Sequence, residues 1–290
     1  MHNTRRAYDA DWKDFSGWCE QYGFTPLPAA ADVLCLYLAE RSGACKVATL
    51  QRRLSTINRM HEQAGAPSPT KMEMVRAVWQ RIRESRNESS EGKDAIDLDI
   101  IGKMVSVQPD NILGIRNRAI LLLGFAGGFR RSDLMNLNWE DIAIKEESIT
   151  VRIPDGRSAP ASGFRELTIS AGQHPATSAV RAVEAWLEAS SIQSGALFRT
   201  INRQGLLQET RLSERAVALV VKEAATAAGL DGSRFGAHSL RLGLVMAAAA
   251  AGVSPEEIIE QTGHRSTRMI HRYARRSKQE PKNIASQVGL

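Results

Sequence analysis

The sequence predicts a mainly α-helical protein of two domains, with a small antiparallel β-sheet or hairpin in the second domain. Three observations lead to this prediction. Apolar residues recur at helical spacing through residues 4–86 and again after residue 97, a polar stretch separates the two regions, and one strand–turn–strand pattern interrupts the second region. With 290 residues, the chain is long enough for each region to bury its own core.

The first region is predicted to be a bundle of four helices. Their apolar stripes lie in residues 8–22, 34–38, 50–61 and 74–82. Thr70 and Glu73 have the spacing of a capping box, which predicts that the fourth helix starts there. Met74, Val78 and Ile82 are then expected to face the core of the bundle.

A linker is predicted between the two regions. Residues 85–94 contain only polar side chains and one glycine, so they have nothing with which to join a core. We therefore assign the first domain to residues 1–86, the linker to residues 87–95 and the second domain to residues 96–290.

The second domain is predicted to combine helices with one hairpin. The expected helices start at residue 97, cover 116–126, 178–189 and 213–228, and start again at residues 238 and 254, and the hairpin strands lie in 149–157 and 165–169. Gly127 and Gly128 end an apolar helix and let the chain turn sharply toward Arg130. A helix that begins at His238 places His238 and Arg241 on one face by their i, i+3 spacing.

The composition indicates a cytosolic protein with an anionic partner. Hydrophobic residues make up 43% of the chain and charged residues 24%, which is ordinary for a globular protein. No apolar run approaches the roughly 20 residues that span a bilayer, and the first residues lack a signal-peptide core. The formal net charge is +6, and residues 265–278 carry six cations and no acid. This distribution favours a polyphosphate backbone as the partner.

The cysteines do not indicate a metal site or a disulfide framework. Cys19, Cys35 and Cys45 are an odd number, widely spaced and without a C-x-x-C pair. Cys19 and Cys35 lie among apolar neighbours and are expected to be buried thiols. We therefore expect neither a metal nor a cofactor.

An ordered set of five residues has the composition needed to attack a phosphodiester without a metal. Arg130 follows Gly-Gly-Phe, His238 and Arg241 form an H-x-x-R motif, His264 follows Gly263 directly, and Tyr273 comes nine residues after His264. Arginine forks bind non-bridging phosphate oxygens. Histidines exchange protons near neutral pH, and a tyrosine oxygen can act as a nucleophile.

This set resembles the catalytic residues of the tyrosine recombinase (phage integrase) family, and the C-terminal part is similar to Cre-like members. The resemblance covers nearly the whole chain and implies a core-binding first domain and a catalytic second domain. It implies that Tyr273 is the nucleophile of a 3′-phosphotyrosyl intermediate and that Arg130 and Arg241 hold the phosphate. His238 is then the general base, and Asp133 supports the geometry of the site.

The resemblance further implies that His264 hydrogen-bonds a phosphate oxygen.

One element of the family pattern, a lysine, is missing from this sequence. Members of the family carry a lysine on the turn of the hairpin, which protonates the leaving 5′-oxygen. Here no lysine occurs between Lys145 and Lys222, and Arg157 occupies the corresponding position. A guanidinium with a pKa above about 12 is a poor proton donor. Lys145 precedes the first hairpin strand and is a weaker candidate than Arg157.

The resemblance implies three kinds of partner: duplex DNA with inverted half-sites, further copies of the chain in a homo-tetramer on two DNA sites, and an accessory DNA-bending protein. It also implies a cytoplasmic protein that is associated with the nucleoid and does not bind a membrane. Two interpretations stay open for residues 281–290: their apolar residues dock onto a neighbouring copy, or the segment is a frayed tail. The candidate DNA-contacting arginines are Arg52, Arg53, Arg59, Arg76, Arg81, Arg83, Arg268, Arg272 and Arg275.

Three functional interpretations follow. The first is a site-specific recombinase or integrase that cuts and rejoins duplex DNA. The second is a cleavage-impaired relative that only binds DNA sites, which Arg157 in the lysine position favours. The third is DNA relaxation of the type IB topoisomerase kind, against which the short N-terminal helical domain argues.

Overall fold

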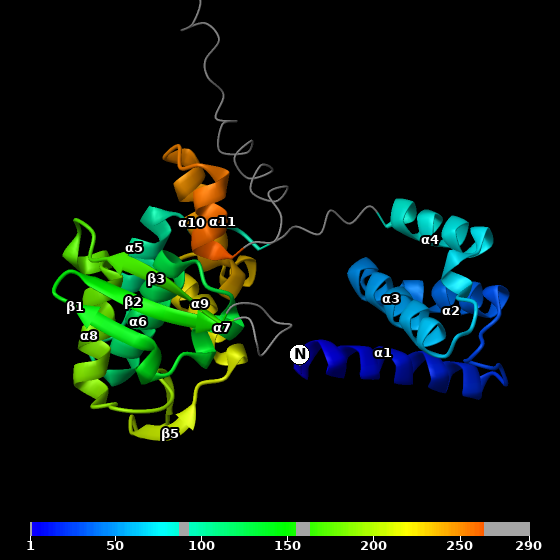
Figure 1. Ribbon diagram of the computed structural model, residues 1–290, viewed down its shortest axis with the longest axis horizontal. Coiled ribbons are helices and arrows are strands. Elements are labelled where there is room, and N and C mark those ends of the chain that lie inside the picture. The colour runs from blue at the N-terminus through cyan, green and yellow to red at the C-terminus, as the bar shows by residue number, and fades with distance from the viewer. Residues whose placement is uncertain (1, 87–92, 155–162, 264–290) are drawn as a thin grey trace, which may run out of the picture. The chain divides into compact units, whose positions relative to one another are not determined.

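The computed structural model describes residues 2–86, 93–154 and 163–263, and the chain divides into two compact units, Met1–Glu91 and Gly92–Leu290 (Figure 1). The predicted fold class is confirmed, because helices dominate and the strands form small antiparallel sheets in the second unit. None of the helices in the described ranges has the length and apolarity that a membrane crossing requires.

Unit 1 is a helical bundle with its own core. Its helices are α1 (His2–Gln21), α2 (Ala31–Ala44), α3 (Val47–Gln63) and α4 (Glu73–Ser85), with a 3-10 turn, η1 (Pro69–Lys71), before α4. Phe15, Leu34, Tyr37, Leu50 and Ile57 are fully or almost fully buried in this core. The amphipathic stripes of the sequence thus pack against one another.

The start of the fourth helix differs from the prediction. Thr70 does not cap α4, because Pro69 starts a 3-10 turn and the Thr70 hydroxyl donates instead to Asn58 Oδ1 at 3.2 Å. The helix begins at Glu73, and the residue that faces the core in its first turn is one position later than predicted. Met74 is therefore 49% exposed, whereas its neighbour Val75 is buried.

Unit 2 packs helices around a central apolar helix and covers one side with a sheet. The helices are α5 (Leu98–Ser106), α6 (Ile112–Gly127), α7 (Arg131–Asn136), α8 (Ala179–Ser190), α9 (Glu214–Ala227), α10 (Ala237–Ala250) and α11 (Pro255–Thr262), with 3-10 turns at Trp139–Asp141, Pro175–Thr177 and Gly232–Arg234. α6 is buried over most of its length and packs against α8 and α10 (Figure 1).

The main sheet of unit 2 has one strand more than the sequence predicts. Its order is β1 (Ile142–Lys145), β2 (Ser148–Pro154), β3 (Phe164–Ser170), all antiparallel, with Ile149 opposite Ile169 and Ile153 opposite Arg165. A second small sheet pairs β4 (Arg199–Ile201) with β5 (Leu207–Arg211). β1 is short and mostly exposed, so its sequence lacks the alternation that marks β2.

Side-chain caps mark the starts of several helices in unit 2. The hydroxyl or carboxylate of Asp97, Ser178, Ser213 and Ser254 accepts a backbone N–H in the first turn of the following helix. At Ser254 the predicted capping box is complete, because Glu257 accepts from the Ser254 N–H at 3.0 Å.

The first residues of unit 2 cross α10 at very close range. The Ile96 N–H donates to Ser239 O at 3.2 Å, and a Cβ placed on Gly243 would lie 1.9 Å from Ile96 O and 2.8 Å from Phe125 Cε2. Only a glycine in α10 allows this crossing, which brings the extended segment before α5 beside the helix that carries His238 and Arg241.

We predict that Gly243→Ala destabilises unit 2 by about 1–3 kcal/mol, because the added methyl overlaps backbone that cannot rotate away. Gly102→Ala in α5 is the matched control, since nothing lies within 4 Å of its added Cβ. It should instead stabilise the unit by about 0.5–1 kcal/mol. Calorimetric melting of the three proteins checks this, and equal melting temperatures would contradict the close crossing.

Candidate active site

Residues from separate segments of unit 2 line one cavity of about 750 Å³. Arg130, His238 and Arg241 face it, and Lys93, Lys222 and Glu214 contribute to its lining as well. The sequence motif around Arg130 and the H-x-x-R motif are far apart in the chain, so the tertiary structure brings their side chains together.

The end of α6 positions Arg130. Gly128 has the left-handed φ of +55° that ends the helix, and Arg130 is the residue before the first turn of α7. The half-buried Arg130 guanidinium lies 3.4 Å from Asp133 Oδ2, while Ser132 Oγ donates to Asp133 Oδ1 at 3.2 Å. Asp133 therefore pairs with Arg130 and is not one of the residues that line the cavity.

The first turn of α10 positions His238 and Arg241, as their spacing predicts. The Ser239 hydroxyl accepts from the Gly236 N–H at 3.1 Å and holds the start of the helix. Arg241 is buried, and its Nη1 donates to Gly128 O at 2.7 Å and to Thr262 O at 2.6 Å. The H-x-x-R motif is thereby tied both to the end of α6 and to the end of α11.

The site is strongly cationic. Burial lowers the pKa of Arg241 to about 10, with a further lowering from the Arg130 charge, so the guanidinium remains charged at neutral pH. His238 is exposed to solvent, yet partial desolvation and then the Arg241 charge lower its imidazole pKa below the ordinary value of 6.5. A neutral imidazole next to two guanidinium groups can accept a proton while the arginines bind an anion.

Several residues of the predicted site lie outside the described residues. These are Tyr273, His264, Arg157, Arg268, Arg272 and Arg275. Lys145 is described and ends β1 opposite Ser148, at the end of the sheet away from the Pro154–Phe164 pair. Lys145 therefore lies at the opposite end of the sheet from Pro154, the last described residue before Arg157 in the chain.

In unit 1, two of the predicted DNA-contacting arginines are engaged internally. Arg52 holds the buried Asp11 carboxylate with two hydrogen bonds of 2.7 and 2.9 Å. Arg53 lies 2.7 Å from Asp14 Oδ2 and donates to Tyr37 Oη at 2.9 Å. These contacts link α1, α2 and α3, so both side chains have a structural role in the bundle.

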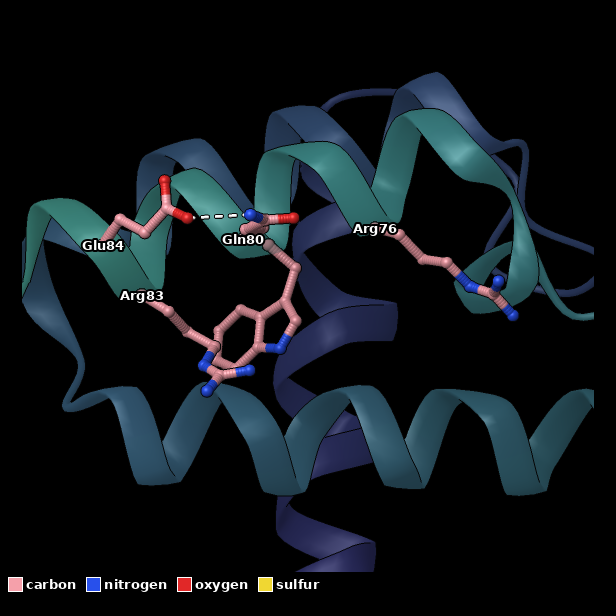
Figure 2. A pocket seen from close by; sticks show the side chains of 5 residues that line it. Arg76, Gln80, Arg83 and Glu84 are labelled. Carbon is pink, nitrogen blue, oxygen red and sulfur yellow. Dashed lines mark hydrogen bonds between the residues drawn. The ribbon is translucent and has the colours of Figure 1, made fainter.

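The arginines of α4 face solvent instead. Figure 2 shows Arg76 and Arg83 extending from α4 beside a hydrogen bond of 2.8 Å between Gln80 and Glu84. These four residues, together with Trp79, line an open cavity of about 570 Å³. Arg81 on the same helix is exposed, and Arg59 on α3 lies over the Tyr8 ring at 5.4 Å.

No motif in the sequence indicates that Lys93 and Lys222 line the cavity or that Arg165 lies near its arginines. Lys93 was assigned to a linker, and its ammonium group in fact donates to Ser233 O beside the cavity. Lys222 lies on α9, where the apolar residues have the spacing of an ordinary amphipathic helix, so nothing in the local sequence distinguishes this lysine. Arg165 alternates with exposed residues in β3, and no local pattern indicates that it reaches α11.

Comparison with known proteins places the chain in a family. Residues 96–280 match the model of the Phage integrase family. The chain is 34% identical over 275 residues to the integrase/recombinase xerD homolog of Selenomonas ruminantium, which covers 93% of this chain and 81% of that protein. It is 26% identical over 321 residues to recombinase cre of Escherichia phage P1, covering 100% of this chain and 89% of that protein.

A solved structure has the same fold. The Tn1549 transposon integrase in complex with transposon right end DNA superposes with a TM-score of 0.66 at 12% identity, covering 97% of this chain and 93% of that one. The match to the family model includes Arg130, His238 and Arg241, and it continues past Tyr273. This chain therefore belongs to the phage integrase family of tyrosine recombinases.

Proposed function

We propose that this chain is a site-specific DNA recombinase or integrase that cuts and rejoins duplex DNA through a 3′-phosphotyrosyl link to Tyr273. One observation carries the proposal: Arg130, His238 and Arg241 line a single cavity although they come from different segments. Two guanidinium groups and a neutral imidazole are suited to bind a phosphodiester and move a proton. Membership of the family, and the DNA bound to the solved relative, support the choice of DNA as the substrate.

In the proposed cleavage step, the phenol oxygen of Tyr273 attacks the scissile phosphorus in line. A bond forms between this oxygen and phosphorus, and the bond to the 5′-oxygen breaks. His238 accepts the phenol proton, because its lowered pKa keeps the imidazole neutral at pH 7. Arg130 and Arg241 neutralise the charge that grows on the non-bridging oxygens, and His264 hydrogen-bonds one of these oxygens.

The rejoining step reverses cleavage with a different strand. A 5′-hydroxyl from a partner duplex attacks the phosphotyrosyl link, which conserves the energy of the broken bond, so neither ATP nor a metal is needed. Asp133 keeps the Arg130 guanidinium oriented throughout. The proposed partners are duplex DNA with inverted half-sites, three further copies of this chain and an accessory DNA-bending protein.

The leaving 5′-oxygen needs a proton, and we propose that a lysine of the cavity supplies it. Arg157 is poorly suited because a guanidinium holds its proton too tightly. Lys93 and Lys222 both line the cavity with Arg130 and His238, and an ammonium group releases its proton more readily. Either lysine would thus replace the hairpin lysine of the family.

We predict a covalent complex between the protein and a duplex that footprinting identifies as its site. Tyr273→Phe should abolish the complex because it removes the nucleophilic oxygen, whereas Tyr22→Phe, an exposed tyrosine in unit 1, should retain it. Denaturing gels of labelled duplex provide the measurement. A wild-type protein that footprints the duplex but forms no complex would leave only DNA occupancy as its function. A complex seen only with Arg157→Lys would identify proton donation as the step this chain lacks.

The rate of cleavage should fall at acidic pH, with a midpoint below 6.5. The reason is that the imidazole must be neutral to accept the phenol proton, and desolvation together with the Arg241 charge lowers the His238 pKa. Single-turnover rates between pH 5 and pH 8 measure this midpoint. His238→Gln should lose the acid limb, and His174→Gln, an exposed histidine outside the cavity, should keep it. An unchanged acid limb in His238→Gln would rule out this base.

A duplex with sulfur in place of the scissile 5′-oxygen tests the proton donor. A thiol has a pKa near 8.5, so the thiolate leaves without a general acid. Loss of the donor, in Lys93→Ala or Lys222→Ala, should slow cleavage of the oxygen duplex by about 10²–10⁴-fold and leave the sulfur duplex unaffected. If both variants cleave the oxygen duplex at the wild-type rate, neither lysine is the donor.

A further inference from the structure

The C-terminal end of α11 is surrounded by arginines. The last carbonyls of a helix have no partner within the helix, and they usually turn to water or to side chains. Here Arg165 Nη1 donates to Gln261 O at 2.7 Å and to Glu260 O at 3.3 Å. The next two carbonyls accept from the phosphate-binding pair of the proposed mechanism, Thr262 O from Arg241 Nη1 at 2.6 Å and Gly263 O from Arg130 Nη2. We call these contacts the helix-end clamp.

Arg165 reaches the clamp from the sheet. It lies on β3 opposite Ile153, whose side chain is buried, and so shares the side of the sheet that faces the core. Gly263, with a φ of +66°, lies directly against the guanidinium: a Cβ there would be 3.5–3.6 Å from three of its atoms. The glycine that ends α11 therefore also provides the surface on which the Arg165 guanidinium rests.

The clamp gathers three guanidinium groups near one point. The charges of Arg130 and Arg165 both act on Arg241, while Asp133 acts in the opposite direction. The C-terminus of a helix carries about half a negative charge, which favours cations at this place. Two of these arginines line the cavity, whereas Arg165 does not.

We propose that Arg165 is a positioning residue for the cleavage reaction. By binding the carbonyls of residues 260 and 261, it fixes the end of α11 against β3, and the next two carbonyls then hold Arg130 and Arg241 in the geometry that receives the phosphate. Gly263 is bonded directly to His264, so the clamp also fixes the point from which the chain continues toward Tyr273. This inference rests on the proposed function.

Attachment of α11 to the rest of unit 2 does not depend on Arg165. Ile258 is buried against Val245 of α10, and Gln261 Nε2 donates to Ala126 O at 2.9 Å. Removal of the guanidinium should therefore free the last turn of α11 without unfolding the domain. The expected effect is on the rate of the chemical step, because misplacement of a catalytic group by about 1 Å costs on the order of 10²-fold.

The test compares Arg165→Met, which keeps an unbranched apolar stem without the guanidinium, and Arg165→Lys, which keeps the charge but not the fork. Arg152→Met is the matched control, because Arg152 lies on β2, is 48% exposed and has its guanidinium over the Phe164 ring at 4.9 Å. Single-turnover cleavage, duplex affinity and melting temperature are measured for each. We expect Arg165→Met to cleave about 10²-fold more slowly at unchanged affinity and melting temperature, Arg165→Lys to be intermediate, and Arg152→Met to match wild type.

Hydrogen exchange of the amides in 256–263 provides a second readout that does not need cleavage. Exchange in the last turn of α11 should be faster in Arg165→Met and unchanged in Arg152→Met. Wild-type cleavage and wild-type exchange in Arg165→Met would overturn the inference, as would a loss of rate that follows a loss of melting temperature. If wild type itself forms no covalent complex, the proposed function fails, and the exchange data still decide whether the clamp exists.

Discussion

Burial of the Arg241 guanidinium beside the Arg130 and Arg165 charges is the main constraint on this site, because desolvation first and these two charges second disfavour its cation. The carbonyls at the end of α11 offset this cost by accepting hydrogen bonds. Arg130, Arg165 and Arg241 all donate to this helix end. Backbone dipoles there supply about half a negative charge without a carboxylate, which would repel a phosphate. Among the described residues, Asp133 is the carboxylate that lies within ion-pair distance of Arg130. The cluster consequently stays positive toward the cavity.

The same helix end depends on close backbone packing elsewhere in unit 2. Gly128 offers its carbonyl to Arg241, and a Cβ on it would lie 2.7 Å from Leu244 on α10. Gly243 lets the Ile96 backbone cross α10 at a distance that no side chain would permit. Glycines thus permit the close packing that brings α6, α10 and α11 together. Larger residues at these points would separate the arginines from the carbonyls that hold them.

Unit 1 uses its arginines in two distinct ways. Arg52 and Arg53 pair with carboxylates of α1, where the buried Asp11 would carry an uncompensated charge without them. Arg76 and Arg83 remain exposed on α4 beside Trp79, and neither forms an ion pair with another residue in the described part of the chain. A charge count along the sequence does not distinguish these cases, because the distinction depends on which helices face one another. Phosphate contacts are better sought on α4 than among the paired arginines.

Local patterns were enough to predict the helical class, the cap at Ser254, and the shared face of His238 and Arg241, because helix period and capping act over a few residues. They mispredicted the exposed Met74 and missed β1, since a single proline shifts a helix start and a short exposed strand has no apolar alternation. The Arg165 contact to α11 was likewise beyond sequence reasoning. Its donor and acceptors lie far apart in the chain and meet only when β3 and α11 pack on the same core. The sequence by itself determined which chemical groups are present and which helix faces carry them. The tertiary structure decided which of these groups form internal contacts that stabilise the fold and which remain accessible to a phosphate, because that depends on which elements pack together.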